Sequence, residues 1–238
     1  DALTGLSFGS NGEFKYPKIT SIPKIYACSA GLGSRDVRGG HFISIVKNMF
    51  ADQPREYSVI GIKHTLALSD GEDPDLRPQG AFSMRGHSVG GFGSVTTNKL
   101  IASFVGELFN IYVQAYPKYG SEKKGLPTTY YLTVAEKHIR THSELAHVEF
   151  IPLNDVNAFN LGNPLDGIAD EGSIFIQSPE TDPQRVWDHI PAYGQKLIRN
   201  KRLKVFYLDT VKIAKEIATD PDLQQRMQGV CLVGIFIR

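Results

Sequence analysis

The residues best suited to chemistry form one glycine-rich stretch, GGFGSVTTNK, at residues 90–99. It joins an extended run at residues 81–85 to an amphipathic helical pattern at about residues 98–109. A glycine-rich turn that leads into a helix gathers unpaired backbone N–H groups and the positive end of the helix dipole. Lys99 adds a positive charge, so the stretch predicts a site for a phosphate or carboxylate group. A purely structural tight turn is the alternative.

The helix after this stretch is predicted from its apolar spacing and its first polar residues. Thr97 or Asn98 is expected to cap the free N–H groups. The repeat places six apolar residues on one stripe: Leu100, Ile101, Phe104, Val105, Leu108 and Phe109.

Two known phosphate-binding motifs do not fit the glycine-rich stretch. Residues 91–93 begin like a dinucleotide-binding fingerprint, but Thr96 stands where the third glycine belongs, and no acidic residue ends a second strand at the expected distance. In the Walker pattern a glycine precedes the lysine, whereas here Asn98 precedes Lys99. The stretch therefore indicates anion binding without indicating a nucleotide.

A nucleophile motif overlaps the glycine-rich stretch. Residues 86–90 match G-x-S-x-G, and Asp170 and His189 follow in the order of an α/β-hydrolase. In that fold the helix begins directly after the serine, whereas the glycines here delay it to about residue 98. A serine hydrolase that uses Ser88 is therefore a minor alternative.

Other polar residues suggest sites with simpler explanations. His138, His142 and His147 lack the glutamate of an H-E-x-x-H zinc motif, so surface histidines are favoured. The acidic residues 69–75 do not follow calcium-loop spacing and are expected to form a solvated connection. Arg140 follows a predicted strand, where open α/β sheets place ligand groups, and is a second candidate anion contact, with an exposed surface arginine as the alternative.

Composition excludes several classes of function. The 238 residues carry 26 basic and 25 acidic side chains, without interleaved basic and aromatic runs, so we expect no nucleic-acid partner. Two cysteines, Cys28 and Cys231, support neither a disulfide framework nor a metal or cluster ligand set, and they indicate a reducing compartment, most simply the cytoplasm. No secretory signal or membrane span is evident. Both chain ends lack the features of a complete protein, so we expect a fragment or a processed subunit.

The order of elements predicts an α/β fold. Residues 25–30 and 57–62 are expected to be strands flanking a helix at residues 41–50, which makes a small partial β-α-β segment. Beyond a boundary near Pro78, a doubly wound, mostly parallel sheet is expected, so the predicted domains are 1–78 and 79–238. Its remaining strands are expected at residues 111–116, 128–135, 148–153, 173–177 and 204–208, and its helices at residues 183–200, interrupted near Pro191, at 209–218 and from 222 onward.

Three motifs in order resemble landmarks of the pyruvate:ferredoxin (flavodoxin) oxidoreductases and related 2-oxoacid oxidoreductases. They are GSRDV at residues 33–37, Gly93-Ser94-Val95 followed by Asn98-Lys99, and KHIR at residues 137–140. Residues 25–65 resemble the end of the domain that precedes the gamma domain, and residues 80–238 resemble the gamma domain itself. The family's loop is similar to GADGTVGANK; here Phe92 replaces the aspartate, Ser94 the threonine, and Thr96-Thr97 the Gly-Ala pair.

The resemblance implies part of a thiamine-diphosphate-dependent enzyme that oxidatively decarboxylates pyruvate or a related 2-oxoacid. Electrons would pass through 4Fe–4S clusters to ferredoxin or flavodoxin, commonly with acyl transfer to coenzyme A. Thiamine diphosphate with Mg²⁺ and the clusters would be bound by other domains or subunits of a homo-oligomeric enzyme, and this chain alone would be inactive. An assembly module without ligand contacts is the other alternative. The implied cofactor-binding residues are Gly93, Ser94, Val95, Thr96, Asn98, Lys99 and Arg140.

Overall fold

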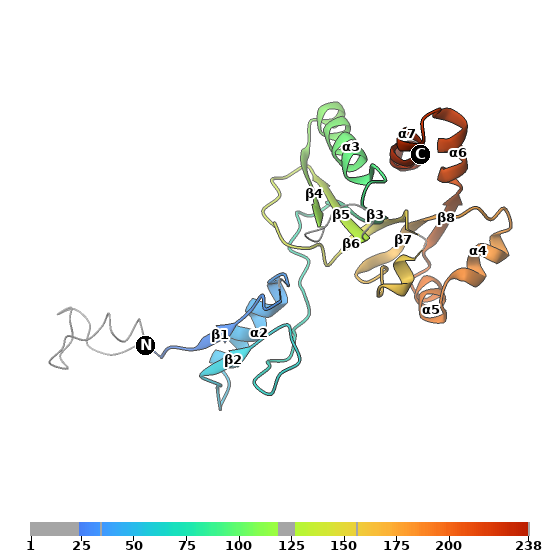
Figure 1. The fold of residues 1–238 in the computed structure, drawn as a ribbon. Coiled ribbons are helices and arrows are strands. Elements are labelled where there is room, and N and C mark those ends of the chain that lie inside the picture. The colour runs from blue at the N-terminus through green and yellow to red at the C-terminus, as the bar shows by residue number, and fades with distance from the viewer. Residues whose placement is uncertain (1–23, 34, 119–126, 156, 238) are drawn as a thin grey trace. The chain divides into compact units, whose positions relative to one another are not determined.

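The chain forms two compact units, Asp1–Pro74 and Asp75–Arg238. The structure is a computed structural model that describes residues 24–33, 35–118, 127–155 and 157–237 (Figure 1). Assignment of the two units to the domains of a larger enzyme stays a prediction.

The first unit is the expected β-α-β segment. Strand β1 (Ala27–Ser29) pairs in parallel with β2 (Tyr57–Val59), and helix α2 (Gly39–Met49) connects them. Parallel strands need such a crossover because their connection must return to the same end of the sheet. The predicted parallel pairing is confirmed, with strands shorter than expected.

Asp73 holds the start of α2 rather than lying in solvent. Its carboxylate Oδ1 accepts a hydrogen bond from the Gly40 N–H at 2.7 Å, and its Oδ2 lies 2.8 Å from the Arg38 guanidinium. Orphan N–H groups at a helix start need such an acceptor. The prediction that residues 69–75 are only a solvated connection is therefore wrong at Asp73, whose side chain is 12% exposed.

The second unit is built on a six-stranded sheet in the order β4-β5-β3-β6-β7-β8. Strands β3, β6, β7 and β8 pair in parallel, whereas β5 runs antiparallel to both β3 and β4. The expected mostly parallel sheet is confirmed, and its interruption by β5 was not predicted. The strands are β3 (Phe82–Val89), β4 (Tyr112–Lys118), β5 (Pro127–Ala135), β6 (Val148–Leu153), β7 (Ile168–Gln177) and β8 (Lys204–Leu208).

Helices cover both faces of this sheet, as a doubly wound fold requires (Figure 1). One face carries α3 (Ser94–Phe109), α6 (Thr210–Ile217) and α7 (Pro221–Ile237), and the other carries α4 (Pro183–His189) and α5 (Ala192–Asn200). A 3-10 turn, Ala158–Asn160, follows β6. Within the described residues, no helix combines the length and the hydropathy that crossing a bilayer requires.

Each face of the sheet has its own apolar core, because successive strand residues point to opposite faces. The core under α3 and α7 contains Met84, Ile101, Val105, Tyr130, Leu132, Val134, Phe150, Phe175 and Leu232. The core under α4 and α5 contains Tyr131, Leu145, Val148, Ile151, Leu153, Ala158, Leu165, Ile168, Ile174, Ile190, Ile198 and Leu203.

The phenol of Tyr130 crosses the middle of the sheet above Gly86. These two residues are partners in the β3–β5 register. A Cβ atom at Gly86 would lie 1.9 Å from Tyr130 Cζ, so the ring occupies the space of a side chain at that position. The fully buried hydroxyl donates a hydrogen bond to Asn154 Oδ1 at 2.7 Å, just beyond β6. Three strands, β5, β3 and β6, are thereby joined through one side chain.

We expect Gly86→Ala to lower the free energy of unfolding by about 3 kcal/mol, because the added methyl group forces the buried ring to move. Chemical denaturation of the chain measures this change. Gly234→Ala is the matched control, since a Cβ there meets no heavy atom within 4 Å and alanine favours the helix by about 1 kcal/mol. Equal stability of the Gly86→Ala chain and the wild type would contradict the packing described.

Candidate functional site

The carboxyl ends of β3 and β6 form a topological switch point. The chain after β3 continues to β4 and β5 on one side, whereas the chain after β6 continues to β7 and β8 on the other. Open α/β sheets bind ligands in the crevice outside the strand ends at such a point. The glycine-rich loop follows β3, and Asn154 and Asp155 follow β6, so both lie at this edge.

The glycine-rich loop is shorter than predicted. Gly91 and Gly93 have φ values of 101° and 76°, a region that L side chains rarely adopt, and α3 begins at Ser94. Gly93 occupies the cap position, and its carbonyl accepts from the Thr97 N–H at 2.9 Å. The prediction that Thr97 or Asn98 caps the helix is therefore wrong, because the glycines complete the turn within three residues.

One side of the loop is closed by α7. A Cβ at Gly93 would lie 2.4 Å from the Arg226 carbonyl oxygen, and a Cβ at Gly229 would lie 2.7 Å from Thr97 Oγ1. Two glycines therefore permit the loop and α7 to touch backbone to backbone. The backbone of α7 therefore covers this side of the loop.

The exposed side of the loop carries two of the predicted site residues. Thr96 and Lys99 are exposed and lie one helical turn apart on the same face of α3, and Gly91 is exposed beside them. The N–H groups of the first turn have no intrahelical acceptor, apart from the Thr97 N–H that bonds to Gly93. Lys99 places its side chain on the same exposed face as Thr96.

Two other predicted site residues are buried. Ser94 is 3% exposed and Asn98 is 2% exposed. The Asn98 side-chain amide donates to the Tyr131 carbonyl at 2.8 Å and so ties α3 to β5. The Asn98 Oδ1 is buried and has no hydrogen-bond partner among the described residues.

Arg140 lies at the opposite edge of the sheet from the glycine-rich loop. Strand β5 is antiparallel to β3, so the segment after Ala135 begins where β3 starts. Neighbouring residues follow β4: the His138 ring packs on Tyr112 with centroids 5.5 Å apart, and His142 Nδ1 lies 2.5 Å from the Gln114 side chain. The structure therefore does not bring Arg140 together with Lys99, although Arg140 is exposed.

The serine motif lies inside a strand rather than at a nucleophile elbow. Ser88 is a β3 residue paired with Thr128, and it is 1% exposed. Its Oγ has no hydrogen-bond partner among the described residues, so no base stands ready to activate it. The serine-hydrolase alternative is wrong, because the motif continues the strand where that fold needs a strand-to-helix turn.

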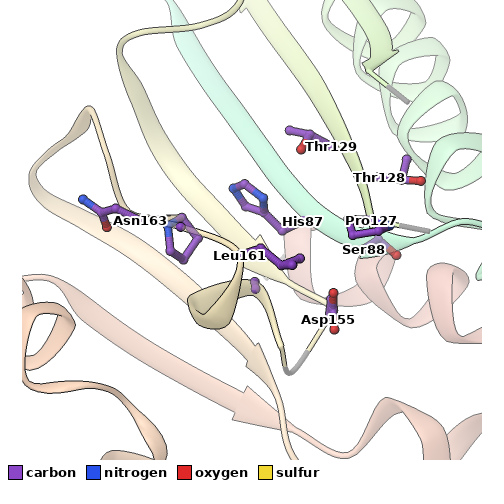
Figure 2. A pocket seen from close by; sticks show the side chains of 11 residues that line it. His87, Ser88, Pro127, Thr128, Thr129, Asp155, Leu161 and Asn163 are labelled. Atoms are coloured by element: carbon purple, nitrogen blue, oxygen red, sulfur yellow. The ribbon is translucent and has the colours of Figure 1, made fainter. Parts of the chain in front are cut away.

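A pocket that the sequence did not predict adjoins the same edge. Its volume is about 250 Å³, and its lining includes His87, Thr129, Asp155, Leu161 and Asn163 (Figure 2). These residues come from β3, from β5 and from the loop after β6. Asn154 and Asp155 directly follow the predicted strand 148–153, and polar residues that end a buried strand face this edge of the sheet. This pair was the sequence feature that could have predicted the pocket.

His87 is a neutral base in this pocket. Burial, and secondarily the charge of Arg85, lower the pKa of His87 to about 4, against an opposing hydrogen bond to the Pro164 carbonyl. Arg85 lies on the same face and donates to the carbonyls of Leu145 and Pro164, each at 3.1 Å. A second charge beside this guanidinium is unfavourable, so the imidazole stays uncharged at neutral pH.

Metal-site geometry is missing from the part of the chain that the structure describes. No group of three or more His, Cys, Asp or Glu side chains there could hold a metal ion. His138 and His142 are exposed and His147 is half-buried. Cys28 and Cys231 lie in separate units and carry free thiols.

We expect His87 to make folding stability fall on acidification from pH 6.5 to pH 4. In this window the unfolded chain binds a proton at His87 that the folded chain does not bind, which costs up to about 3 kcal/mol. Denaturation at several pH values should show a smaller slope for His87→Gln than for wild type. His189→Gln, at an exposed histidine, should keep the wild-type slope. Parallel profiles for all three proteins would contradict the buried neutral imidazole.

Comparison with known proteins gives one consistent family. A family model described as "Pyruvate ferredoxin/flavodoxin oxidoreductase" matches residues 83–238. The pyruvate-flavodoxin oxidoreductase of Trichormus variabilis is 26% identical over 220 residues, which cover 91% of this chain and 18% of the relative. The pyruvate:ferredoxin oxidoreductase of Moorella thermoacetica is 28% identical over 202 residues, which cover 83% and 17%.

A solved pyruvate oxidoreductase subunit from Thermotoga maritima is 18% identical with a TM-score of 0.48, covering 64% of this chain and 75% of that chain. The chain spans less than a fifth of the length of the two curated relatives. Since the family model matches well over half of its residues, the chain belongs to the pyruvate ferredoxin/flavodoxin oxidoreductase family.

Proposed function

We propose that this chain is the gamma part of an enzyme that oxidatively decarboxylates pyruvate or a related 2-oxoacid and passes the electrons to ferredoxin or flavodoxin. The observation that carries the proposal is the family match over residues 83–238. The mixed α/β sheet of the second unit, with its switch point beside a glycine-rich loop, supports it. The enzyme acts in the cytoplasm.

The redox cofactors of this enzyme are bound outside the chain. A 4Fe–4S cluster takes four cysteine thiolates, whereas the sequence has two cysteines, in separate units. Among the described residues, no group of three or more His, Cys, Asp or Glu side chains could hold a metal ion. The two cysteines do not fit a 4Fe–4S cluster, and this proposal assigns the clusters, together with thiamine diphosphate and its Mg²⁺, to other domains or subunits.

The open side of the glycine-rich loop contacts an anionic group of coenzyme A or of the thiamine cofactor. Gly93, Ser94, Val95 and Thr96 supply backbone N–H groups, and Lys99 supplies a charge on the exposed face of α3. Asn98 acts indirectly, because its amide fixes α3 on the Tyr131 carbonyl. Each charge-assisted hydrogen bond contributes about 1.5–3 kcal/mol.

Arg140 contributes separately from this loop. It is exposed at the opposite edge of the sheet, where it can meet an anionic group on another domain or on a second part of a long cofactor. Phe92, Thr96 and Thr97 depart from the family's loop pattern, and all three lie in the glycine-rich stretch. Substitutions in this stretch therefore test most directly whether the enzyme uses coenzyme A.

Assembly with other parts of the enzyme is a second role that one surface favours. Helix α3 exposes Leu100, Phe104 and Leu108, at 52%, 46% and 61%, at the i, i+4, i+8 spacing of one face. Their neighbours Ile101 and Val105 are buried in the core. An apolar stripe that does not pack on its own unit is typical of an interface with another domain or protomer.

We expect Lys99→Ala, made in the complete oxidoreductase, to raise the KM of its anionic cofactor about tenfold, because the variant loses one charge-assisted contact. Steady-state kinetics with coenzyme A varied, and then with thiamine diphosphate varied, identifies which cofactor is affected. Lys196→Ala removes another exposed lysine, on α5, and should leave both KM values unchanged. Unchanged KM and kcat in the Lys99→Ala enzyme would refute the anion site.

A further inference from the structure

A second, larger hollow in the second unit is an apolar groove on the face of the sheet that carries α3 and α7. Its volume is about 890 Å³. The buried rings of Phe150 and Phe175 line it, and so do the exposed rings of Phe109 and Phe206. The groove therefore extends from the core to the surface.

Helix α7 and strand β8 lie on different sides of this groove. On one side, the Phe236 ring of α7 packs against Phe82 and Phe150, with ring centroids 5.9 Å and 6.5 Å apart. On the other side, β8 is the outer strand of the sheet (Figure 1). Three exposed β8 side chains alternate along the strand and so share one face: Lys204, Phe206 and Leu208. Parallel strands are normally covered on both faces, so this part of β8 lacks a cover within the unit.

The lining of the groove carries one uncompensated charge. Its two charged side chains are Glu149 and Lys204. The Glu149 carboxylate accepts from the Arg77 guanidinium at 2.7 Å and 2.8 Å and from the Ser83 N–H at 2.6 Å, so its charge is already paired. Lys204 is exposed and forms no ion pair with another described residue. The groove therefore favours an apolar group that brings a negative charge to Lys204.

Three observations favour another part of the enzyme over a second copy of this chain as the occupant. In a two-fold contact centred on the groove, the Lys204 ammonium groups of both copies would approach each other, which is unfavourable. The chain covers 18% of the Trichormus variabilis relative, so most of an enzyme of that length is available as a partner. Phe109 directly follows Leu108, the last residue of the exposed α3 stripe, so the groove continues a surface proposed for assembly.

We propose that an apolar segment from another domain or subunit of the oxidoreductase, with an aspartate or glutamate beside Lys204, fills this groove. Its apolar side chains pack on the exposed rings of Phe109 and Phe206, and its carboxylate pairs with the Lys204 ammonium. This inference rests on the proposed function, because it needs a larger enzyme. It concerns a different site from the anion site, since the groove includes Phe82, the first residue of β3, whereas the glycine-rich loop follows the last.

Lysine acetylation of the wild-type protein tests whether the groove is filled. N-acetoxysuccinimide is applied to the isolated chain and to the complete oxidoreductase, and mass spectrometry measures the rate at each lysine. We expect Lys204 to react about tenfold more slowly in the complete enzyme, because the segment covers it and pairs its charge. Lys196, which is exposed on α5 on the other face of the sheet, should react at similar rates in both.

A carbodiimide cross-link identifies the occupant. This reagent joins a lysine amine to a carboxylate in contact with it, without a spacer. In the complete enzyme we expect Lys204 to be linked to an aspartate or glutamate outside residues 1–238, in a segment with apolar neighbours. Lys204→Gln should abolish that link.

A pair of variants tests the apolar part of the contact. Phe206→Ser removes a ring that the segment packs on, and it should raise the acetylation rate of Lys204 in the complete enzyme about tenfold. Ile217→Ser removes an exposed apolar side chain on α6 outside the groove lining and should leave Lys204 protected. If Phe206→Ser fails to fold by circular dichroism, the wild-type comparison still decides.

Three results would overturn the proposal. Equal acetylation of Lys204 in the isolated chain and in the complete enzyme would show that no segment covers the groove. A link from Lys204 to a carboxylate within residues 1–238 would show that this chain or a second copy fills it. Protection of Lys204 without any link would contradict the acidic partner. All three are read on the assembled protein whether or not it oxidises pyruvate, so an activity assay of the same sample separates them from failure of the proposed function.

Discussion

The close contact between Gly86 and Tyr130 is the constraint on which the second unit depends. Any other residue at position 86 would place a Cβ inside the phenol ring, 1.9 Å from Cζ. Because the ring is fully buried, its hydroxyl must find a partner, and it finds Asn154 Oδ1 at 2.7 Å. One side chain thus decides where β3, β5 and the end of β6 lie relative to each other.

The contacts of Tyr130 with Gly86 and Asn154 position the candidate site. The His87 carbonyl accepts hydrogen bonds from the N–H groups of Asn154 and Asp155, at 2.8 Å and 3.1 Å. The end of β3 and the segment after β6 are therefore bound together at the switch point, with the glycine-rich loop on one side and the His87 pocket on the other. Lys99 lies on the exposed face of the helix after the loop, and Asp155 lines the pocket.

Sequence reasoning predicted elements whose signals are local. The break at Pro191 depends on neighbouring residues alone and is confirmed. The helix expected at residues 209–218 forms at Thr210–Ile217, and Asp209 caps it by accepting from the Lys212 N–H at 3.0 Å. Pairing between distant segments was not predicted from the sequence. Strand β5 runs antiparallel to β3, which places Arg140 at the opposite edge of the sheet from the loop. The role of Asn98 likewise depends on Tyr131, thirty-three positions along the chain. The His87 pocket was not predicted, because its lining residues come together only when three separate segments fold.

Removal of the Tyr130 hydroxyl oxygen tests most directly whether Tyr130 holds β3, β5 and the end of β6 together. Tyr130→Phe keeps the ring over Gly86 but leaves Asn154 Oδ1 without its donor, which costs about 1–3 kcal/mol. Hydrogen exchange should then quicken at the Asn154 and Asp155 amides, which bond to the His87 carbonyl, while amides in the β7–β8 ladder change only with global stability. Unchanged exchange at Asn154 and Asp155, with unchanged free energy of unfolding, would contradict the claim that Tyr130 holds this edge together.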